Sequence, residues 1–320
     1  MRRARLLATA VAAGFAAAAT AGAGRATSPN GTIVFQRVWL SPIAYQIFSV
    51  HADGTGLRQL TRGPARVDST EPDPSPDGRW IVFQRGPHMG TSEVYTMRAD
   101  GTGLRRLTYC QTCHWTGDPS FSPDGDSIVF VRENGDGRVA IWRMRSDGTR
   151  QRLVLRVPRG RFADQPVFSP DGRYIAYRSK TAAGQTSIFV ASALGRGASP
   201  ITPRRIYASR PRWSPDGKLI LFYTTNKDDL KLGISANLDV IRPDGSGLRT
   251  LTHDRGGSIQ NYEPSWSPDG SWITFARETA ANKPPGQHSS ADIYVMRSDG
   301  TDIRRIVGVG YFDHWPTWGR

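Results

Sequence analysis

Cysteine, lysine and long apolar runs are scarce in this chain of 320 residues. It holds two cysteines, which excludes a disulfide-rich scaffold, and five lysines. A membrane-spanning helix needs ~20 apolar residues in a row, and no segment beyond the N-terminal one approaches that length. The chain also lacks a Gly-x-Ser-x-Gly elbow, a His-Glu-x-x-His pair and a phosphate-binding glycine loop, so it shows no recognisable catalytic motif.

The N-terminal segment has the features of a secretory signal. Three arginines precede an uncharged run over residues 6–19, and small residues then offer cleavage after Ala23 or Ala26. We expect residues 1–26 to be a signal peptide, removed on export to the periplasm, the cell wall or the medium. An uncleaved membrane anchor is the alternative interpretation.

The net charge of +14 comes almost wholly from arginine. A basic protein can bind nucleic acid or anionic surfaces. Because an exported protein rarely meets nucleic acid, we expect no nucleic-acid partner and consider an anionic wall polymer instead. The other interpretation is arginine spread over solvated outer strands without a binding role. We expect the chain to be a monomer.

One short motif recurs along the chain. Ser-Pro-Asp-Gly begins at five positions, in steps of 47, 47, 45 and 53 residues: Ser75, Ser122, Ser169, Ser214 and Ser267. Proline presets the first corner of a tight turn, and glycine supplies the positive φ. An apolar β-rich run follows each motif, then a second run and an Asp-Gly turn. Without sustained helical periodicity, this repeat predicts about four strands per ~45 residues.

The number of repeats follows from lettering the strands A to D, from the centre outward. Strand A, which ends in Ser-Pro-Asp-Gly, occurs five times, whereas residues 31–35 make a sixth B strand with no A strand before it. Residues 315–319 match residues 263–267 and supply the missing A strand. The sequence therefore predicts one all-β domain over residues 27–320. It is a six-bladed β-propeller of four antiparallel strands per blade, closed by the C-terminal strand completing the first blade.

The repeat carries a family resemblance. Its pattern is Pro-x-[Trp/Phe]-Ser-Pro-Asp-Gly, an apolar strand, Ile-Tyr-Val-Met-x-x-Asp-Gly and Leu-Arg-Arg-Leu-Thr, and it resembles the WD40-like (PD40) repeats of the TolB propeller family. The resemblance covers residues 31–320. It implies a six-bladed ring around a central channel and a role as a protein-interaction platform in the cell envelope. We expect neither the separate N-terminal domain of TolB nor the hydrolase domain of peptidases with similar propellers.

The alternation of antiparallel strands sorts the connections into two faces. The A–B and C–D turns share one face, here called the turn face, and the B–C and D–A loops share the other, here called the loop face. The turns are short and uniform, whereas the loops are long and varied, above all residues 224–236 and 277–290. Because functional residues concentrate on variable loops held by a rigid scaffold, we expect the loop face to bind the partner.

The mouth of the channel on the loop face should be lined by the residues just before each inner strand. These form an acidic ring interrupted by one arginine: Asp68, Glu71, Asp118, Asp164, Arg210, Glu263, Asp313 and His314. Like charges so close together raise carboxylate pKa values unless a cation joins them. We interpret the ring either as a site for a cation, a basic peptide or a sugar, or as side chains that accept hydrogen bonds from backbone N–H groups.

Most of the histidines fall on the same face. They are His88, His114, His253, His288 and His314. Their spacing forces no cluster, and no metal-binding motif is present, so no metal site is assigned. A metal ion at the channel mouth remains the minor alternative.

Two cysteines and a histidine form the sequence Cys-Gln-Thr-Cys-His in a D–A loop. In an exported chain, Cys110 and Cys113 are expected to form a disulfide. With His114 they also fit the attachment pattern of a c-type haem, although no second axial ligand is evident. A redox or metal-binding role for the two thiols is the remaining alternative.

Three functional hypotheses follow. The first is a non-catalytic binding module of the cell envelope or extracellular space, without a cofactor, which engages a protein, peptide or wall polymer. The second is a metal-dependent polysaccharide lyase that uses histidine and carboxylates at the channel mouth. The third is a haem-bearing redox protein that uses the Cys-x-x-Cys-His sequence.

Overall fold

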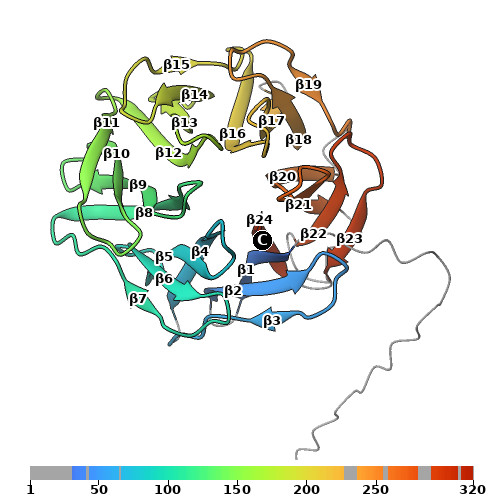
Figure 1. Cartoon of the computed structure of the whole chain (residues 1–320), viewed down its shortest axis with the longest axis horizontal. Helices are drawn as coiled ribbons and strands as arrows, with labels where there is room; N and C mark the ends of the chain where they lie inside the picture. The colour runs from blue at the N-terminus through green and yellow to red at the C-terminus, as the bar shows by residue number, and fades with distance from the viewer. Residues whose placement is uncertain are drawn as a thin grey trace, which may run out of the picture.

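The computed structural model describes residues 31–40, 43–64, 66–226, 236–254, 259–279, 290–308 and 311–319. The regular elements of these residues are β-strands, and their sheets stand as a ring around a central axis (Figure 1). No helix in this part of the chain is long and apolar enough to cross a membrane. The predicted signal peptide, His288 and most of the loops 224–236 and 277–290 lie outside the described residues.

Four sheets contain four antiparallel strands each, which run from the centre of the ring outward in chain order (Figure 1). The first comprises β4 (Val67–Pro74), β5 (Trp80–Pro87), β6 (Glu93–Arg98) and β7 (Arg105–Arg106). The second comprises β8 (Cys113–Phe121), β9 (Ser127–Asn134), β10 (Val139–Arg145) and β11 (Arg152–Arg156). The third comprises β12 (Arg161–Phe168), β13 (Tyr174–Thr181), β14 (Thr186–Ser192) and β15 (Ser199–Pro200). The fourth comprises β16 (Ile206–Trp213), β17 (Ile220–Asn226), β18 (Ala236–Ile241) and β19 (Arg249–Thr250).

A fifth, eight-stranded sheet closes the ring. One half comprises β20 (Ile259–Trp266), β21 (Trp272–Thr279), β22 (Ala291–Arg297) and β23 (Arg304–Val307). The other comprises β24 (Phe312–Trp318), β1 (Thr32–Leu40), β2 (Ile43–His51) and β3 (Arg58–Gln59). A single parallel bridge between Ala291 and Phe312 joins the halves. Because β24 pairs antiparallel with β1, with Trp318 opposite Ile33, the predicted closure by the C-terminal strand is confirmed.

The repeated turns fold as their sequence predicts. In the first, the N–H of Gly78 donates to the carbonyl of Ser75 at 2.9 Å, and Gly78 has a φ of 70°. The hydroxyl of Ser75 in turn accepts the N–H of Trp80, the first residue of the next strand. The same contact in all five Ser-Pro-Asp-Gly turns places the start of the B strand that follows each of them on the turn face, which positions the clefts described below.

The hydrophobic core lies between neighbouring sheets. Equivalent phenylalanines in the B strands are fully buried: Phe35, Phe83, Phe130, Phe222 and Phe275. One cluster joins Val82 and Val94 of the first sheet to Phe121 and Phe130 of the second. Since no sheet covers both of its faces alone, burial against its neighbours is what stabilises the ring.

Candidate functional site

Each innermost strand has a β-bulge at an equivalent place, where its pairing with the B strand shifts register. The bulge residues have φ between 48° and 58° although none is glycine, and each precedes a proline: Glu71, Asp118, Gln165, Arg210, Glu263 and Trp315. Proline has no N–H to give to a ladder, so a bulge is where a strand tolerates it. We call these six residues the bulge ring.

The bulge residues are linked by hydrogen bonds from one sheet to the next. The N–H of Asp118 donates to Oε2 of Glu71 at 3.1 Å. The N–H of Gln165 donates to Oδ2 of Asp118 at 3.0 Å, and that of Arg210 to Oε1 of Gln165 at 2.8 Å. Backbone donors that the bulges remove from the ladder are thereby satisfied.

This series stops where a bulge side chain has no acceptor atom. Arginine carries only donors, and so does the indole of tryptophan. The N–H of Trp315 donates to Oε2 of Glu263 at 2.8 Å, while the N–H of Glu71 donates to Oε1 of Gln36 at 3.2 Å. These contacts agree with the second interpretation of the acidic ring, as acceptors for backbone N–H groups. Its binding of a ligand stays a prediction.

Arg210 of β16 reaches two other inner strands. Its Nη1 lies 3.8 Å from Oδ1 of Asp118 in β8, and its guanidinium carbon lies 4.7 Å from the ring centroid of Trp315 in β24. Arg210 is buried, with 7% of its surface exposed. One cation therefore offsets part of the negative charge of the bulge ring.

A second arginine spans the ring two residues further along β16. Nη2 of Arg212 lies 3.8 Å from Oδ1 of Asp73 in β4 and 3.5 Å from Oγ1 of Thr317 in β24. Arg212, Asp73 and Thr317 also line a cavity of about 230 Å³, with Ser120 and Ser265 among its other walls. The two arginines therefore cross-link inner strands from different sheets.

The buried carboxylates of the acidic ring differ in the direction in which their surroundings shift the pKa. Burial and the neighbouring Asp118 carboxylate raise the pKa of Glu71 well above its usual range. Burial also raises the pKa of Asp164, although Arg178 forms a bidentate ion pair with it. These two acids bind a proton more readily than exposed carboxylates do.

Glu263 behaves in the opposite way. Burial works to raise its pKa, but the imidazole of His314, Arg210 and the backbone N–H of Trp315 together lower it. Nδ1 of His314 lies 3.1 Å from Oε2 of Glu263. Glu263 is therefore an anion beside an imidazole at the loop-face end of the ring.

The predicted mouth residues lie within the inner strands rather than just before them, which corrects that placement. The reason is that each strand continues through its bulge instead of starting after it. Six of the eight belong to the network around the bulge ring. The other two are paired elsewhere: Asp68 lies 2.8 Å from Nδ1 of His88, and Asp313 accepts two bonds of 2.7 Å from Arg37.

A set of aromatic side chains at the same end of the inner strands was not predicted from the sequence. Four of the six positions three residues before the bulge hold half-buried aromatics: Trp115, Phe162, Tyr207 and Phe312. We call these the aromatic crown. The rings of Trp115 and Phe162 stack at 6.1 Å, and Phe312 stacks on His314 at 4.5 Å. Their fixed spacing from the bulge prolines was a usable signal.

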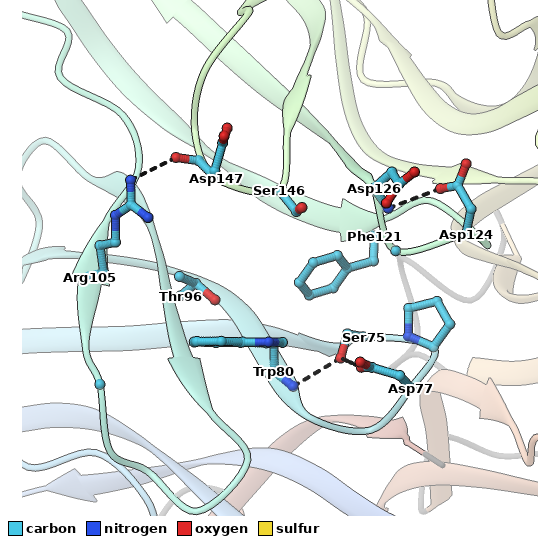
Figure 2. A pocket seen from close by; sticks show the side chains of 13 residues that line it. Ser75, Asp77, Trp80, Thr96, Arg105, Phe121, Asp124, Asp126, Ser146 and Asp147 are labelled. Carbon is cyan, nitrogen blue, oxygen red and sulfur yellow. Dashed lines mark hydrogen bonds between the residues drawn. The ribbon is translucent and has the colours of Figure 1, made fainter.

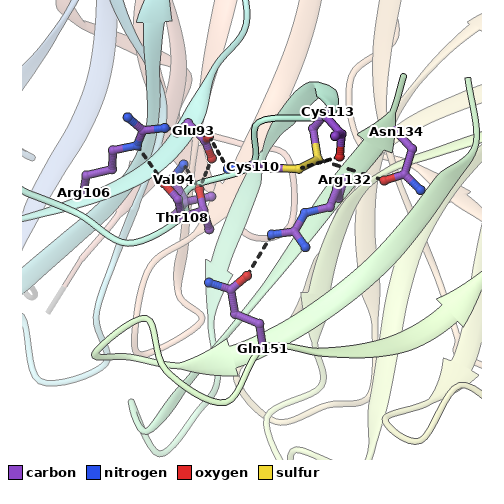
Figure 3. Close-up of a disulfide and its surroundings, with 10 residues drawn as sticks. Glu93, Val94, Arg106, Thr108, Cys110, Cys113, Arg132, Asn134 and Gln151 are labelled. Atoms are coloured by element: carbon purple, nitrogen blue, oxygen red, sulfur yellow. Dashed lines mark hydrogen bonds and ion pairs between the residues drawn. A yellow bond between two sulfur atoms is a disulfide. The ribbon is translucent and has the colours of Figure 1, made fainter. Parts of the chain in front are cut away.

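The two cysteines are paired in the D–A loop that leads into β8 (Figure 3). Their Cα atoms are 5.5 Å apart. The N–H of Cys110 donates to Oε1 of Glu93 at 2.8 Å, and Arg106 donates to the same oxygen at 2.8 Å. The two sulfurs share one bond, and His114, the third residue of the haem-attachment pattern, is exposed.

In the described part of the chain, no group of three or more histidine, cysteine, aspartate or glutamate side chains is placed to hold a metal ion. His88 and His314 each contact one carboxylate, Asp68 and Glu263 respectively.

Known proteins share this architecture. Among solved structures, the chain is similar to TolB from Acinetobacter baumannii, with a TM-score of 0.73 and 19% identity over 91% of this chain and 67% of that one. Putative TolB from Agrobacterium tumefaciens gives a TM-score of 0.63 and 18% identity over 89% and 97%. An oligogalacturonate lyase in complex with manganese gives 0.53 and 17% over 81% and 71%.

Identities this low show a shared fold alone. No curated protein matches the chain. The model of the TolB beta propeller domain family, PD40, matches residues 7–202 and 116–284, which is more than half of the sequence. The chain therefore belongs to the TolB β-propeller domain family.

Proposed function

We propose that this chain is an exported six-bladed propeller that binds a partner protein or peptide on its loop face and catalyses no reaction. Six blades follow when the eight-stranded sheet is divided at the bridge between Ala291 and Phe312. Strands β20 to β23 then form one blade, and β24 with β1 to β3 forms another.

The aromatic crown is the observation that carries this proposal. Aromatic side chains supply large contact area at low entropic cost and are enriched in protein interfaces. Here they come from separate inner strands and occupy equivalent places three residues before the bulge, which supports a shared contact surface on the loop face. Beside them, Glu263 and His314 supply a carboxylate and an imidazole whose Oε2 and Nδ1 lie 3.1 Å apart.

The buried carboxylates are a weaker choice for the contact surface. Glu71, Asp118 and Glu263 accept backbone hydrogen bonds from neighbouring sheets, so they hold the scaffold together. Substituting them would weaken the fold and the binding surface at once. The crown can be altered with less effect on that network.

The test places a photo-crosslinking residue, p-benzoylphenylalanine, in the full chain expressed in its own host. Substitution at Phe162 or Tyr207 is expected to yield discrete crosslinked adducts. Leu194, which is 68% exposed beside a turn-face connection, is the control position. Adding Trp115→Ala should remove the adducts without altering the circular dichroism spectrum. Adducts of the same mass from Leu194 as from the crown positions, or none from the crown, would contradict the proposal.

A metal-dependent lyase is the second candidate function. It is supported by the fold shared with an oligogalacturonate lyase in complex with manganese and by the contact between His314 and Glu263. Incubation with oligogalacturonate and Mn²⁺ should then produce an unsaturated sugar that absorbs ultraviolet light. If that product forms, and His314→Ala abolishes it, this function replaces the binding module.

A further inference from the structure

Two large clefts open on the turn face, opposite the aromatic crown. One, of about 560 Å³, lies between the first and second sheets (Figure 2). The other, of about 640 Å³, lies between the third and fourth. The walls match position by position along the repeat: Trp80 with Tyr174, Phe121 with Trp213, Asp77 with Asp171, Asp124 with Asp216, and Asp147 with Asp244.

Each cleft has an exposed aromatic platform. Trp80 and Tyr174 are the first residues of β5 and β13, and they are 38% and 40% exposed. In Figure 2 the indole of Trp80 lies across the cleft from the ring of Phe121. The equivalent residues are Ser127, which begins β9, and Leu219, which directly precedes β17, so among the described residues an aromatic platform recurs only at alternate sheets.

Both clefts are acidic although the protein is strongly basic. Four aspartates and Arg105 line the first cleft, and three aspartates line the second. Hydrogen bonds from turn hydroxyls, such as Ser75 to Asp77 and Ser169 to Asp171, lower the pKa of these carboxyls. The same cause lowers the pKa of four further wall residues: Asp124, Asp147, Asp216 and Asp244.

A third equivalent position shows which group fits over such a platform. Trp272 begins β21 as Trp80 begins β5, but it is only 7% exposed. The guanidinium carbon of Arg304, the first residue of β23, lies 4.8 Å from its ring centroid, and that of Arg297 lies 5.0 Å away. The fold itself therefore stacks an arginine from the outermost strand on this tryptophan.

The two open clefts lack that arginine. The residue equivalent to Arg304 is Arg105 in the first cleft, and its Nη2 donates to the backbone carbonyl of Asp147 at 2.9 Å (Figure 2). In the second cleft the equivalent residue is Ser199, which has no charge. The guanidinium carbon of Arg98 lies 5.9 Å from the ring centroid of Trp80, and that of Arg173, which also pairs with Asp171, lies 6.0 Å from that of Tyr174. Both distances exceed the 4.8 Å of Arg304 over Trp272, and the two platforms keep 38% and 40% of their surface exposed beside ionised carboxylates.

We propose that the clefts at Trp80 and Tyr174 are binding sites for arginine side chains of a partner polypeptide. Each arginine would stack on the aromatic platform as Arg304 stacks on Trp272, with its charge facing the turn aspartates. Two such sites, two sheets apart, fit a partner that presents two arginines. This surface is separate from the aromatic crown, so it extends the proposed function rather than depending on it.

The test measures binding of a fluorescein-labelled peptide with two arginines to the full chain, by fluorescence anisotropy at low salt. A matched peptide with citrulline keeps the shape of the side chain and removes its charge. We expect the citrulline peptide to bind at least about tenfold more weakly. Trp80→Ala and Tyr174→Ala should each weaken the arginine peptide about three- to tenfold.

Two further variants make the result specific. Ser199→Arg should place an internal arginine over Tyr174, as Arg304 lies over Trp272, and weaken binding of the two-arginine peptide about three- to tenfold, as Tyr174→Ala does. Tyr109→Ala removes an aromatic of 71% exposure on the loop face and should leave binding unchanged. Equal binding of the citrulline peptide, or unchanged affinity in both platform variants, overturns the proposal.

Discussion

Oε2 of Glu263 in β20 lies 3.1 Å from Nδ1 of His314 in β24 and accepts the N–H of Trp315 at 2.8 Å. One carboxylate thus holds the closing strand of the ring against the inner strand of the neighbouring blade. Glu263→Ala should remove both contacts and lower the free energy of unfolding by about 2–3 kcal/mol. Urea unfolding measures this. Glu133→Ala, a carboxylate change near the end of β9, is the control and should cost less than about 0.5 kcal/mol.

Acid should remove the same contribution. Because the folded state lowers the pKa of Glu263, its stabilisation is present above the ordinary glutamate pKa and is lost as pH falls through the folded value. Stability of the parent chain should therefore decline on acidification more than that of Glu263→Gln. Parallel pH profiles for the two proteins would show that Glu263 makes no such contribution.

Glu71 should change the stability with pH in the opposite direction to Glu263. Its raised pKa means that the folded state binds the proton more tightly, so stability falls as pH rises from the unfolded pKa through the folded one. Glu71→Gln keeps an oxygen for the N–H of Asp118 and removes the charge. We expect it to raise the free energy of unfolding at neutral pH by about 1 kcal/mol. Thermal unfolding at several pH values checks this, and a lower stability of the variant at neutral pH refutes it.

Arg210 should stabilise the fold chiefly because it offsets the negative charge of the buried carboxylates around it. Arg210→Met leaves Asp118 without its 3.8 Å partner and should lower the free energy of unfolding by about 3 kcal/mol. Adding Asp118→Asn, which still offers an oxygen to the N–H of Gln165, should recover part of that loss. A double-mutant cycle measures the coupling. Strictly additive losses would show that the two side chains do not interact energetically.

The cysteine pair gives a prediction for mass as well as stability. The protein exported by its host should be lighter than the reduced chain by two hydrogens and should start after residue 23 or 26. Replacing both Cys110 and Cys113 by serine should lower the free energy of unfolding by about 2 kcal/mol, as a short loop permits. Intact mass spectrometry before and after reduction measures whether the disulfide is present and where the exported chain starts. A haem-sized addition, or free thiols, contradicts the disulfide.

The strands and their closure were predictable because each depends on local signals. Ser-Pro-Asp-Gly fixes a turn whatever surrounds it, and the match between residues 315–319 and 263–267 shows which strand is missing at the start. The residues of the acidic ring were predicted from the sequence, but the directions of their pKa shifts were not. Whether Glu71 binds a proton and Glu263 loses one depends on which neighbours the ring brings beside each.

Other features could not be predicted from local patterns. Aromatics such as Trp115 and Phe162 are ordinary strand formers, so residue type alone does not separate the crown from core residues, and only their spacing from the bulge prolines marks them. The difference between Trp80 and Trp272 lies in where the arginine of the outermost strand points, since both strands begin with one. Side-chain direction across a sheet is a tertiary property, and it decides which cleft is open.

The pairing of Ile33 with Trp318 has a consequence for how the chain acquires its structure. The sheet that contains β1 stays incomplete until β24, the last strand of the chain, pairs with it. This contact spans the greatest sequence separation, so it is also among the last that can form. Until then β1 presents an unpaired edge that can capture strands from other molecules. Pairing of β24 with β1 therefore competes with intermolecular pairing at the same edge of β1. Conditions that delay the pairing of β24 favour aggregation over folding.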